Sequence, residues 1–454
     1  MSQTERWIVV GAGASGLATA FFLRQIGLDS VIIERDAAPG GRIGSVQLGG
    51  RSLDSGGKNI GRRYTLFRQF ASSLGTHRFE YFGLNSSQVV NGKLVTFDAG
   101  ARWRTMLRVV HGTSARDVVR LSRLLWSVRR QEENGYLGSD YARDLARHYD
   151  DAPVSHYFSP EFCRRIIRPM SVRMNGAEPD EIYMGNLGSN VRMLTDTYEQ
   201  LQCGLGPLLH AALSQYDVRL NTACESLIMS SGRISGVNVR YPDGASDVIR
   251  GAGVVLTTPA AVSAQLTESI LPSLAEQLRS VAYYPVGLIF AEYDRPVFSA
   301  GIRALVFGKD EPLSNAGAYG LSDLNLVRYT FSGRAARRYL LNFTDAEGML
   351  QLGEALLAKH ISLNPATRRR FVAKKFALGL CAYTPHHATF LAGLQRETDN
   401  APGLHLTGDY LQGASIEACF RAARACVGRL ATVNGQPCTD RAPACACCAI
   451  DDWA

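Results

Sequence analysis

Short apolar segments and helical repeats alternate from the first residues of the chain. Ile8-Val9-Val10 is a β-branched run that predicts a buried parallel strand. Residues 18–26 have a helical composition and end at Gly27, which suits a helix C-cap. A second predicted strand over residues 30–33 ends at Glu34. This strand–helix–strand order predicts an α/β fold that opens with a Rossmann-like unit.

Later segments carry patterns of other kinds. Residues 113–133 have a strong helical repeat after a good N-cap, with an apolar stripe and flanking arginines. The stripe consists of Val118, Leu121, Leu125 and Val128, and the arginines are Arg116, Arg120, Arg123 and Arg130. Such a helix can make peripheral contact with an anionic membrane, but a core-facing stripe with solvated arginines is the favoured interpretation. Alternating positions over 288–298 predict a strand, and residues 344–361 predict a helix.

The composition is that of an ordinary globular protein, with 454 residues of which 46% are hydrophobic and 20% charged. This length predicts two or three domains. No run of 18 or more apolar residues occurs, and the N-terminal residues MSQTER contain no signal-peptide core. We therefore expect no transmembrane segment and a cytoplasmic location. The net charge of +8 is compatible with anionic partners, but no nucleic-acid-binding motif accompanies it, so we expect no nucleic-acid partner.

Ten cysteines are present, and four of them crowd the C-terminal residues 436–454. These four are Cys438, Cys445, Cys447 and Cys448. The segment has no helical or strand repeat, which predicts a flexible tail. Its cysteines could bind a soft metal or form disulfides, but they lack the paired CxxC units of a zinc site. We favour a redox-labile tail and expect no metal site.

Three glycines, Gly11, Gly13 and Gly16, lie between the first predicted strand and the first predicted helix. In this context the spacing is typical of dinucleotide binding, where glycines allow a tight turn, close approach of a pyrophosphate and close helix packing. Ala14 and Ser15 lie at the start of the helical segment, and free N–H groups at a helix N-terminus bind phosphate. The glycines alone are compatible with NAD, NADP and FAD.

Glu34 follows the glycines by about 20 residues, where a carboxylate accepts hydrogen bonds from ribose hydroxyls. The same carboxylate would repel the 2′-phosphate of NADP, although the neighbouring Arg35 weakens that argument. Two more glycine turns follow, at Gly40-Gly41-Arg42 and at a segment containing Asp54, Gly56, Gly57 and Gly61. Repeated close approach of the backbone implies a long ligand.

These motifs, in this order, resemble the hallmark of the FAD-dependent amine oxidase superfamily, which includes monoamine oxidases, protoporphyrinogen oxidases and phytoene-type desaturases. The resemblance implies a Rossmann-like FAD-binding domain of the GR2 type, interleaved with an α+β substrate-binding domain. It also implies that Gly41, Arg42, Gly56, Gly57 and Lys58 lie near FAD. Some relatives attach FAD to a cysteine, but Cys381 does not align with that position, so we expect non-covalent FAD.

The resemblance returns at residues 404–430, which look like the closing FAD motif of the superfamily. A strand ends at Gly408-Asp409, and Ser415 caps a helix that continues to residue 429. By resemblance, Asp409 binds the diphosphate–ribityl region and the N–H of Ile416 points at the flavin N1/O2 edge. A helix N-terminus stabilises the negative charge of reduced flavin there. Residues 217–227 resemble the adenine-contacting strand, with Cys224 in the contacting position.

The nucleotide motifs lie in three separated pieces of the chain. We therefore expect a discontinuous FAD-binding domain over residues 1–85, 200–265 and 395–435. The intervening residues 86–199 and 266–394 then form the substrate-binding domain. No internal repeat is evident.

The segment 374–390 resembles a family segment that carries a Trp, a Pro-x-Tyr and a Gly-His. Phe376 stands in place of Trp and Cys381 in place of Pro, whereas Tyr383 and His386 match. The resemblance implies that Tyr383 forms a wall of the substrate site and that His386 is a hydrogen-bond partner. A packed tyrosine and a surface histidine remain the alternative.

Three cations beside the predicted flavin loop could take part in the chemistry. Lys58 could contact the flavin or a substrate anion, and Arg62 and Arg63 could bind a carboxylate. Solvated loop charges are an equally good interpretation. Many amine oxidases also keep a lysine near flavin N5, but the matching stretch 282–293 contains none. This departure favours the protoporphyrinogen-oxidase and desaturase side of the superfamily.

The resemblance implies an FAD-dependent oxidoreductase that oxidises a small organic substrate. We expect hydride transfer from a C–N bond of an amine or amino acid, or from a ring C–C bond, to flavin N5. Molecular oxygen is the expected acceptor, with hydrogen peroxide as its product. A porphyrinogen or polyene desaturase is the first alternative. A non-redox flavin protein, such as an isomerase or mutase, or an FAD-binding scaffold is the second. A homodimer is compatible with the sequence.

Overall fold

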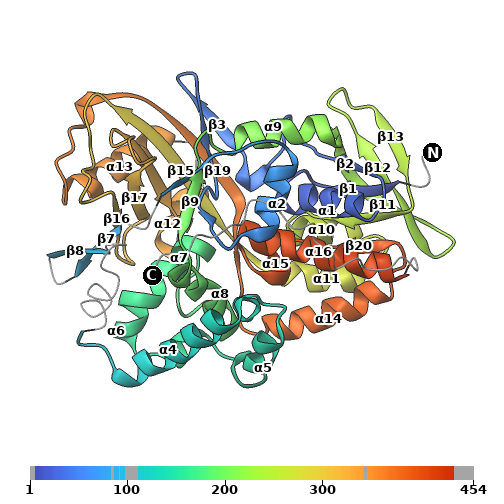
Figure 1. Cartoon of the computed structure of the whole chain (residues 1–454), viewed down its shortest axis with the longest axis horizontal. Coiled ribbons are helices and arrows are strands. Elements are labelled where there is room, and N and C mark those ends of the chain that lie inside the picture. Colours follow the sequence, from blue (N-terminus) through green and yellow to red (C-terminus); the bar gives the residue numbers. More distant parts are fainter. Residues whose placement is uncertain (1–5, 83–85, 91–92, 98–110, 342–344, 434–454) are drawn as a thin grey trace.

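The computed structural model describes residues 6–82, 86–90, 93–97, 111–341 and 345–433. Figure 1 shows a parallel sheet wrapped by helices on one side of the molecule and long antiparallel strands on the other. A group of helices containing α4, α5 and α8 lies along a third side. The cysteine-rich segment 436–454 lies outside the described residues. Within the described ranges, no helix combines the length and apolar character needed to cross a bilayer.

The parallel sheet confirms the predicted α/β class. Its strand order is β10-β2-β1-β14-β20, and every neighbouring pair is parallel. The strands are β1 (Trp7–Val10), β2 (Ser30–Ile33), β10 (Asp217–Arg219), β14 (Gly253–Leu256) and β20 (Leu404–Leu406). The β-branched run predicted for the first strand lies at its centre and is buried on both faces. Thus three distant parts of the chain meet in one sheet.

Helices cover both faces of this sheet. They are α1 (Ala14–Gln25), α2 (Thr65–Ser73), α9 (Gly206–Gln215), α10 (Ala260–Thr267), α11 (Pro272–Arg279), α14 (His387–Asp399), α15 (Asp409–Gln412) and α16 (Ile416–Val433). Helix α1 begins four residues earlier than the helical composition predicts, directly after the N-cap Gly13. Leu274, Ala275 and Leu278 of α11 share a core with strands of the parallel sheet. Helix α11 therefore packs on the parallel sheet, although the predicted domain boundary at residue 265 assigns this helix to the substrate-binding domain.

Three smaller sheets accompany the parallel one. Strands β11 (Ala223–Ser230), β12 (Arg233–Arg240) and β13 (Ser246–Arg250) form an antiparallel sheet. Strands β3 (Ser45–Leu48) and β4 (Arg51–Asp54) form a hairpin. Strand β9 (Tyr198–Leu201) pairs with β5 (Ile60–Gly61) and β6 (Phe79–Tyr81).

The seven-stranded sheet is the main element of the predicted substrate-binding domain. Its order is β19-β15-β18-β17-β16-β7-β8. The strands are β7 (Ser86–Val90), β8 (Lys93–Phe97), β15 (Ala282–Tyr293), β16 (Ala304–Val306), β17 (Leu313–Ala318), β18 (Leu326–Phe331) and β19 (Arg368–Ala382). One face packs on α12 (Arg334–Leu341) and α13 (Ala346–Ala358), and the other faces the β3–β4 hairpin. A short 3-10 turn, η7 (Pro365–Thr367), precedes β19.

A helical group completes the fold. It contains α4 (Ala115–Arg130), η4 (Glu132–Gly135), α5 (Asp140–Tyr149), η5 (Val154–His156), α6 (Pro160–Phe162), the π-helical turn η6 (Cys163–Ile167), α7 (Arg168–Asn175) and α8 (Met184–Thr195). The apolar stripe predicted for residues 113–133 lies in the core that α4 shares with α8, which confirms the core-facing interpretation. On the opposite side of α4, Val119 and Trp126 are exposed.

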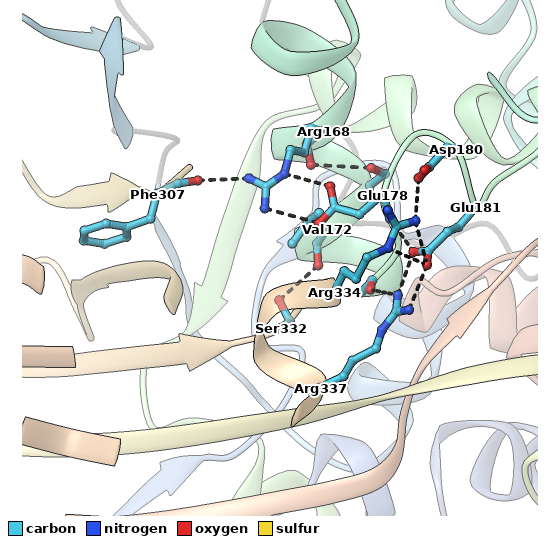
Figure 2. A network of polar contacts seen from close by, with 11 residues as sticks. Arg168, Val172, Glu178, Asp180, Glu181, Phe307, Ser332, Arg334 and Arg337 are labelled. Atoms are coloured by element: carbon cyan, nitrogen blue, oxygen red, sulfur yellow. Dashed lines mark hydrogen bonds and ion pairs between the residues drawn. The ribbon is translucent and has the colours of Figure 1, made fainter. Parts of the chain in front are cut away.

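A buried arginine network fixes α7 against its neighbours (Figure 2). Arg168 is 6% exposed, and its Nε donates to Glu178 Oε2 over 2.8 Å while its Nη1 donates to Phe307 O over 3.0 Å. Arg334 and Arg337 of α12 hold Glu181 in the loop that follows α7. Helix α7 is therefore clamped to the seven-stranded sheet and to α12.

Candidate functional site

The first glycine turn is closed on one side and open on the other. Gly11 has φ of 107°, and a Cβ on Gly16 would overlap Gly11 O, so both positions require glycine. A Cβ on Gly13 would meet only Gly40 O, at 3.9 Å. Gly13 caps α1 without a side chain, and Ala14 and Ser15 form the first turn. Backbone N–H groups at such a helix start can bind a phosphate.

Two more glycine segments border the same space. Gly40 N donates to Ala12 O over 2.8 Å, and Gly41 lies beside Gly13. A Cβ on Gly56 would overlap Arg42 O, whereas Gly57 has no atom within 4 Å of its Cβ position. We call Gly13, Gly41 and Gly57, at which a Cβ would meet no atom closer than 3.9 Å, the glycine cradle. The structure thus brings the three predicted glycine motifs together.

The end of β2 lies next to the cradle. Glu34 is 8% exposed, and its carboxylate accepts hydrogen bonds from Ala12 N over 2.7 Å and from Asp36 N over 3.0 Å. Arg35 is exposed and lies 3.7 Å from the carboxylate of Asp36. Thr222 N donates to Glu34 O over 2.8 Å, which brings the start of β11 to the same place. Cys224 is half-buried there, and burial raises the pKa of its thiol to about 12.

Arg42 and Asp409 meet across the cradle. Arg42 Nη1 donates to Asp409 Oδ2 over 2.5 Å, and Tyr283 Oη donates to Asp409 Oδ1 over 2.8 Å. The Asp409 side chain is 7% exposed, whereas that of Arg42 keeps 31% of its surface accessible. The pair joins the Gly-Gly-Arg turn to the loop after β20. Tyr283, in β15, is a site residue that the sequence motifs did not reveal.

Helix α16 begins beside Asp409. Ser415 Oγ accepts from Ala418 N over 3.1 Å, so Ser415 is the N-cap that the sequence predicts. Ile416, the first residue of the helix, is 7% exposed. Glu417 is fully buried and accepts from Leu66 N over 3.2 Å and Phe67 N over 3.0 Å. Glu417 thus caps α2 from the first turn of α16, and no local sequence pattern pointed to this role.

Lys58 is enclosed rather than free. Its Nζ donates to Gln200 Oε1 over 3.0 Å and to Tyr319 O, and lies 4.4 Å from the Phe82 ring centre and 4.0 Å from that of Tyr319. Burial, followed by the charge of Arg328, lowers the pKa of Lys58 to about 7. Because its donors are engaged, Lys58 connects the loop after Gly57 to the seven-stranded sheet. This contact suits a positioning residue better than a proton-transfer group.

Arg62 and Arg63, which follow the predicted flavin loop, do not point toward a common site. The Arg62 side chain is 61% exposed, and its Nε lies 2.9 Å from Glu199 Oε1. Arg63 is half-buried, and its backbone N donates to Asp196 over 3.4 Å. The predicted bidentate site for a carboxylate is therefore not formed by Arg62 and Arg63 in this structure, because Arg62 is directed to the surface by Glu199.

Tyr383 and His386 also lie away from open space. Tyr383 has no exposed surface, and its Oη donates to Asp409 O over 2.7 Å, so it supports the loop rather than lining a substrate wall. His386 is an exposed residue with φ of 69° at the start of α14. Its neighbour His387 turns inward instead, with Nε2 2.9 Å from Tyr410 O. The sequence-based roles of Tyr383 and His386 thus do not match their placement.

The model of the flavin containing amine oxidoreductase family matches residues 14–431. The chain belongs to this family. Among curated relatives, a Mycobacterium tuberculosis protein named as a flavin-containing monoamine oxidase, AofH, is 25% identical over 64% of this chain and 66% of its own length. Hydroxyneurosporene desaturase of Rubrivivax gelatinosus is 35% identical over 16% of this chain and 14% of its own length. Both matches span less than two thirds of the relative.

Solved structures of the family share the fold. Cyclohexylamine oxidase from Brevibacterium oxydans IH-35A has a TM-score of 0.72 and 18% identity, and the match covers 95% of this chain and 100% of that one. This likeness shows the fold, and the family match over residues 14–431 agrees with the superfamily that the motifs predicted.

The residues of the site fit the FAD of this family. The cradle offers backbone that a pyrophosphate can approach, and α1 and α16 offer two helix N-termini. Arg42 would hold the diphosphate, Asp409 the ribityl region, Glu34 the ribose, and Cys224 would lie near the adenine. No group of three or more metal-ligating side chains occurs in the parts of the chain that the structure describes.

Proposed function

We propose that the protein oxidises a small amine or amino acid at its C–N bond, with non-covalent FAD as the primary oxidant and molecular oxygen as the final acceptor. Bound FAD would supply a two-electron acceptor for the hydride of the substrate, and oxygen would take up the electrons with hydrogen peroxide as the product. The observation that carries this proposal is the glycine cradle between the N-termini of α1 and α16. It is supported by the family and by the amine oxidase names of two relatives.

In this proposal the side chains and backbone of the protein bind the cofactor and fix its orientation. Ser415 fixes the start of α16, whose free N–H groups favour negative charge in the space ahead of them. Tyr283 and Arg42 hold the Asp409 carboxylate from two sides, which gives it a single orientation. Tyr383 holds the backbone of the same residue from behind. These contacts organise the loop in advance, so that little ordering remains when the cofactor binds.

Non-covalent attachment is supported by the state of the nearby thiols. Burial raises the pKa of Cys419 to about 11 and that of Cys381 well above its ordinary value. A protonated thiol is a poor nucleophile, so neither cysteine is prepared to form a bond to flavin. Acid precipitation of the purified protein should therefore release all flavin into the supernatant. Flavin that stays with the pellet would contradict this part of the proposal.

Desaturation of a C–C bond is the second candidate function. It is favoured by the absence of lysine from β15, the strand that should carry the lysine near N5 in amine oxidases. The name of one relative, a desaturase, points the same way. Anaerobic bleaching of the flavin by a panel of amines, amino acids, porphyrinogens and polyenes separates the two functions. Bleaching by amines or amino acids alone supports the first, and bleaching by polyenes or porphyrinogens alone supports the second.

Two glycine variants test the cradle itself. Gly57→Val places a side chain in the cradle. We therefore expect the purified variant to show little or no flavin absorbance at about 450 nm. Gly308→Val is the matched control, because Gly308 also has no atom within 4 Å of its Cβ position but lies beyond β16. Equal flavin content in both variants would exclude the cradle as the cofactor site. Cell fractionation and light scattering test two further parts of the proposal, a cytoplasmic location and a homodimer.

A further inference from the structure

Two asparagines of α8 are completely buried and have no polar partner. Asn186 and Asn190 each have 0% of their surface exposed. Neither the amide nitrogen nor the carbonyl oxygen of either side chain has a hydrogen-bond partner among the residues that the structure describes. A folded protein normally pairs the polar groups that it buries, so each exception requires an explanation. Four such atoms on neighbouring turns of one helix indicate a site for a polar molecule.

The two side chains share one face of the helix. Residues four positions apart lie one turn from each other, with roughly 5–6 Å between their Cβ atoms. At that separation one small planar group can contact both carboxamides. Because the carboxamides of Asn186 and Asn190 do not bond to each other, their donors and acceptors are available to a third group.

This face of α8 points into the protein. A Cβ on Gly188 would lie 3.9 Å from both Leu124 Cδ1 of α4 and Asn134 O of η4, so the side of Gly188 faces these outer elements. Two residues along a helix rotate a side chain by about 200°. Asn186 and Asn190 lie two residues before and after Gly188, so both point away from α4. In Figure 1, α4 lies along the outer edge of the molecule and α8 lies inside it.

Helix α8 also contacts the loop that holds Asp409. Tyr183, which precedes the helix, donates its backbone N–H to Tyr383 O over 3.0 Å, and Tyr383 Oη bonds in turn to Asp409 O. Further along α8, Ser189 Oγ lies 3.0 Å from the position of a Cβ on Gly413, in the same loop. The asparagine pair therefore lies in a helix that packs directly against the loop after β20.

The helix brings no charge to the face of the two asparagines. Its sequence, MGNLGSNVRMLT, contains one charged residue, Arg192. Arg192 follows Asn190 by two residues and so lies on the side of Gly188. There its Nη2 is 3.2 Å from Glu132 Oε1 of η4. An ammonium group has only donors and a carboxylate only acceptors, whereas each carboxamide offers both. A neutral group with a donor beside an acceptor, such as an amide, matches this pair.

We propose that Asn186 and Asn190 bind an uncharged amide group of the substrate, so that the molecule oxidised is an amine that also carries a carboxamide. This inference rests on the proposed function for the word substrate, but the amide site itself does not depend on redox activity. A polyene would leave all four polar atoms buried without partners, which opposes its binding.

The first test measures binding of an amide that carries no oxidisable amine. Flavin-loaded protein is titrated with benzamide by calorimetry and by the change in flavin absorbance. Benzoate is the charged analogue, and acetophenone is the analogue without donors. We expect benzamide to bind saturably, on the order of 10-fold or more tighter than either analogue. Absence of saturable benzamide binding, or equal affinity for benzoate or acetophenone, would overturn the proposal.

Variants assign the binding to the asparagine pair. Asn186→Leu and Asn190→Leu keep the branched side chain without its polar atoms, and each should weaken benzamide binding by about 10-fold. Asn186→Ala and Asn190→Ala repeat the test without added volume. Asn325→Leu is the matched control, because Asn325 Nδ2 is already bonded to Tyr293 O over 3.1 Å. It should leave the benzamide affinity unchanged. Wild-type affinity in the leucine and alanine variants of the pair would refute the assignment.

A purely structural role for the two asparagines predicts a different outcome. If the carboxamides held buried water or the flavin, their removal would lower the thermal midpoint or the flavin content. Because neither has a partner in the described chain, Asn186→Leu should keep the flavin content of the wild type and keep or raise its midpoint. Asn325→Leu should lower the midpoint, since it breaks an existing hydrogen bond. Loss of flavin from Asn186→Leu, or a lower midpoint with unchanged benzamide affinity, would overturn the proposal.

A final comparison separates the inference from the proposed function. Anaerobic flavin bleaching is measured with phenylalaninamide, phenylalanine and phenethylamine, which differ only in the group on the carbon beside the amine. We expect the amide to bleach the flavin at the lowest concentration, and Asn190→Leu to remove this preference by raising KM rather than lowering kcat. Bleaching by phenylalanine or phenethylamine at a lower concentration would refute the amide site and leave the oxidase function standing. Benzamide binding without bleaching by any of these compounds would do the reverse.

Discussion

At Lys58 a single ammonium group connects the cradle loop to the seven-stranded sheet. Burial lowers its pKa from 10.5 to about 7, so between these values the unfolded chain holds a proton that the folded protein lacks. The contribution of Lys58 to the free energy of unfolding therefore rises with pH across this interval, by up to about 1.4 kcal/mol per pH unit.

Lys58→Met should remove this dependence. We expect the difference in unfolding free energy between wild type and variant to shift in favour of the wild type by about 2–3 kcal/mol between pH 7 and pH 9. Guanidinium chloride titrations at both pH values measure it. Lys374→Met, which removes an exposed lysine from β19, is the control and should give the same difference at both. A constant difference for Lys58→Met would contradict the lowered pKa.

His387 offers a second test of a buried titratable group. Burial among aromatic side chains lowers its pKa from 6.5 to about 4, while the hydrogen bond to Tyr410 O acts in the opposite direction. The unfolded chain takes up a proton as pH falls through 6.5, and the folded protein does so only near 4. His387 therefore costs up to about 3 kcal/mol of stability across this interval. His387→Gln, which can still donate to Tyr410 O, should reduce the loss of stability between pH 6.5 and pH 4, measured as the thermal midpoint at each pH. The matched control is His386→Gln, which replaces an exposed side chain and should leave this loss as it is in the wild type.

The two neighbouring histidines show what a sequence cannot supply at the scale of one residue. His386 matches the family pattern by position, yet its backbone adopts φ of 69° and its side chain is exposed. The inward side chain belongs to His387, because α14 starts between them and rotates the next residue toward Tyr183 and Tyr383. The direction of a side chain at a helix start depends on tertiary packing, and short patterns do not encode it. Glycine positions were predictable because their backbone requirement is local.

At the scale of elements, the N-terminus of α16 is organised by more than its cap. The buried carboxylate of Glu417 bonds to two N–H groups of α2, so the starts of two helices are locked together. The sequence predicted α16 and its cap from Ser415 and from the resemblance of residues 404–430 to the closing FAD motif. It did not predict the α2 contact, since residues 350 or more positions apart carry no local signal of their pairing.

Replacement of Glu417 tests this lock. Glu417→Leu removes both acceptors and leaves two N–H groups of α2 buried without partners, which should cost about 2–4 kcal/mol of stability. Glu417→Gln keeps a carbonyl oxygen at the same place and should cost about 1 kcal/mol or less. Denaturant titrations of the flavin-free proteins measure both. Equal losses would mean that the charge, rather than the acceptor geometry, holds the two helices.

For the whole molecule, the decisive feature is that the cofactor site is assembled from chain segments hundreds of residues apart. The motifs were each predictable, because a strand–turn–helix with glycine is a local unit. Their order allowed the interleaved arrangement to be expected from the superfamily. The contacts around the motifs were less predictable: Tyr283 lies in β15 with no motif around it, yet it donates to the Asp409 carboxylate. The packing of β15 against the loop after β20 brings these two side chains together.

The Arg42–Asp409 pair, which spans 367 residues of sequence, tests how that assembly serves the cofactor. Arg42→Met removes a cation from the predicted diphosphate position and leaves the buried Asp409 carboxylate with Tyr283 alone. We expect FAD to bind on the order of 100-fold more weakly, measured by flavin fluorescence during reconstitution of the apoprotein. Asp409→Asn should weaken binding by about 10-fold, since the amide keeps one acceptor for Tyr283.

The double variant decides between two arrangements. If the pair acts as one unit toward FAD, the losses of the single variants overlap, and the double-mutant cycle gives a coupling of about 1–2 kcal/mol. If Arg42 serves the diphosphate and Asp409 the ribityl chain separately, the losses add. Arg35→Met is the control, because Arg35 is exposed and only weakly paired with Asp36, so its removal should change FAD affinity less than threefold, or about 0.6 kcal/mol. Additive losses would show that Arg42 and Asp409 contribute to FAD binding independently.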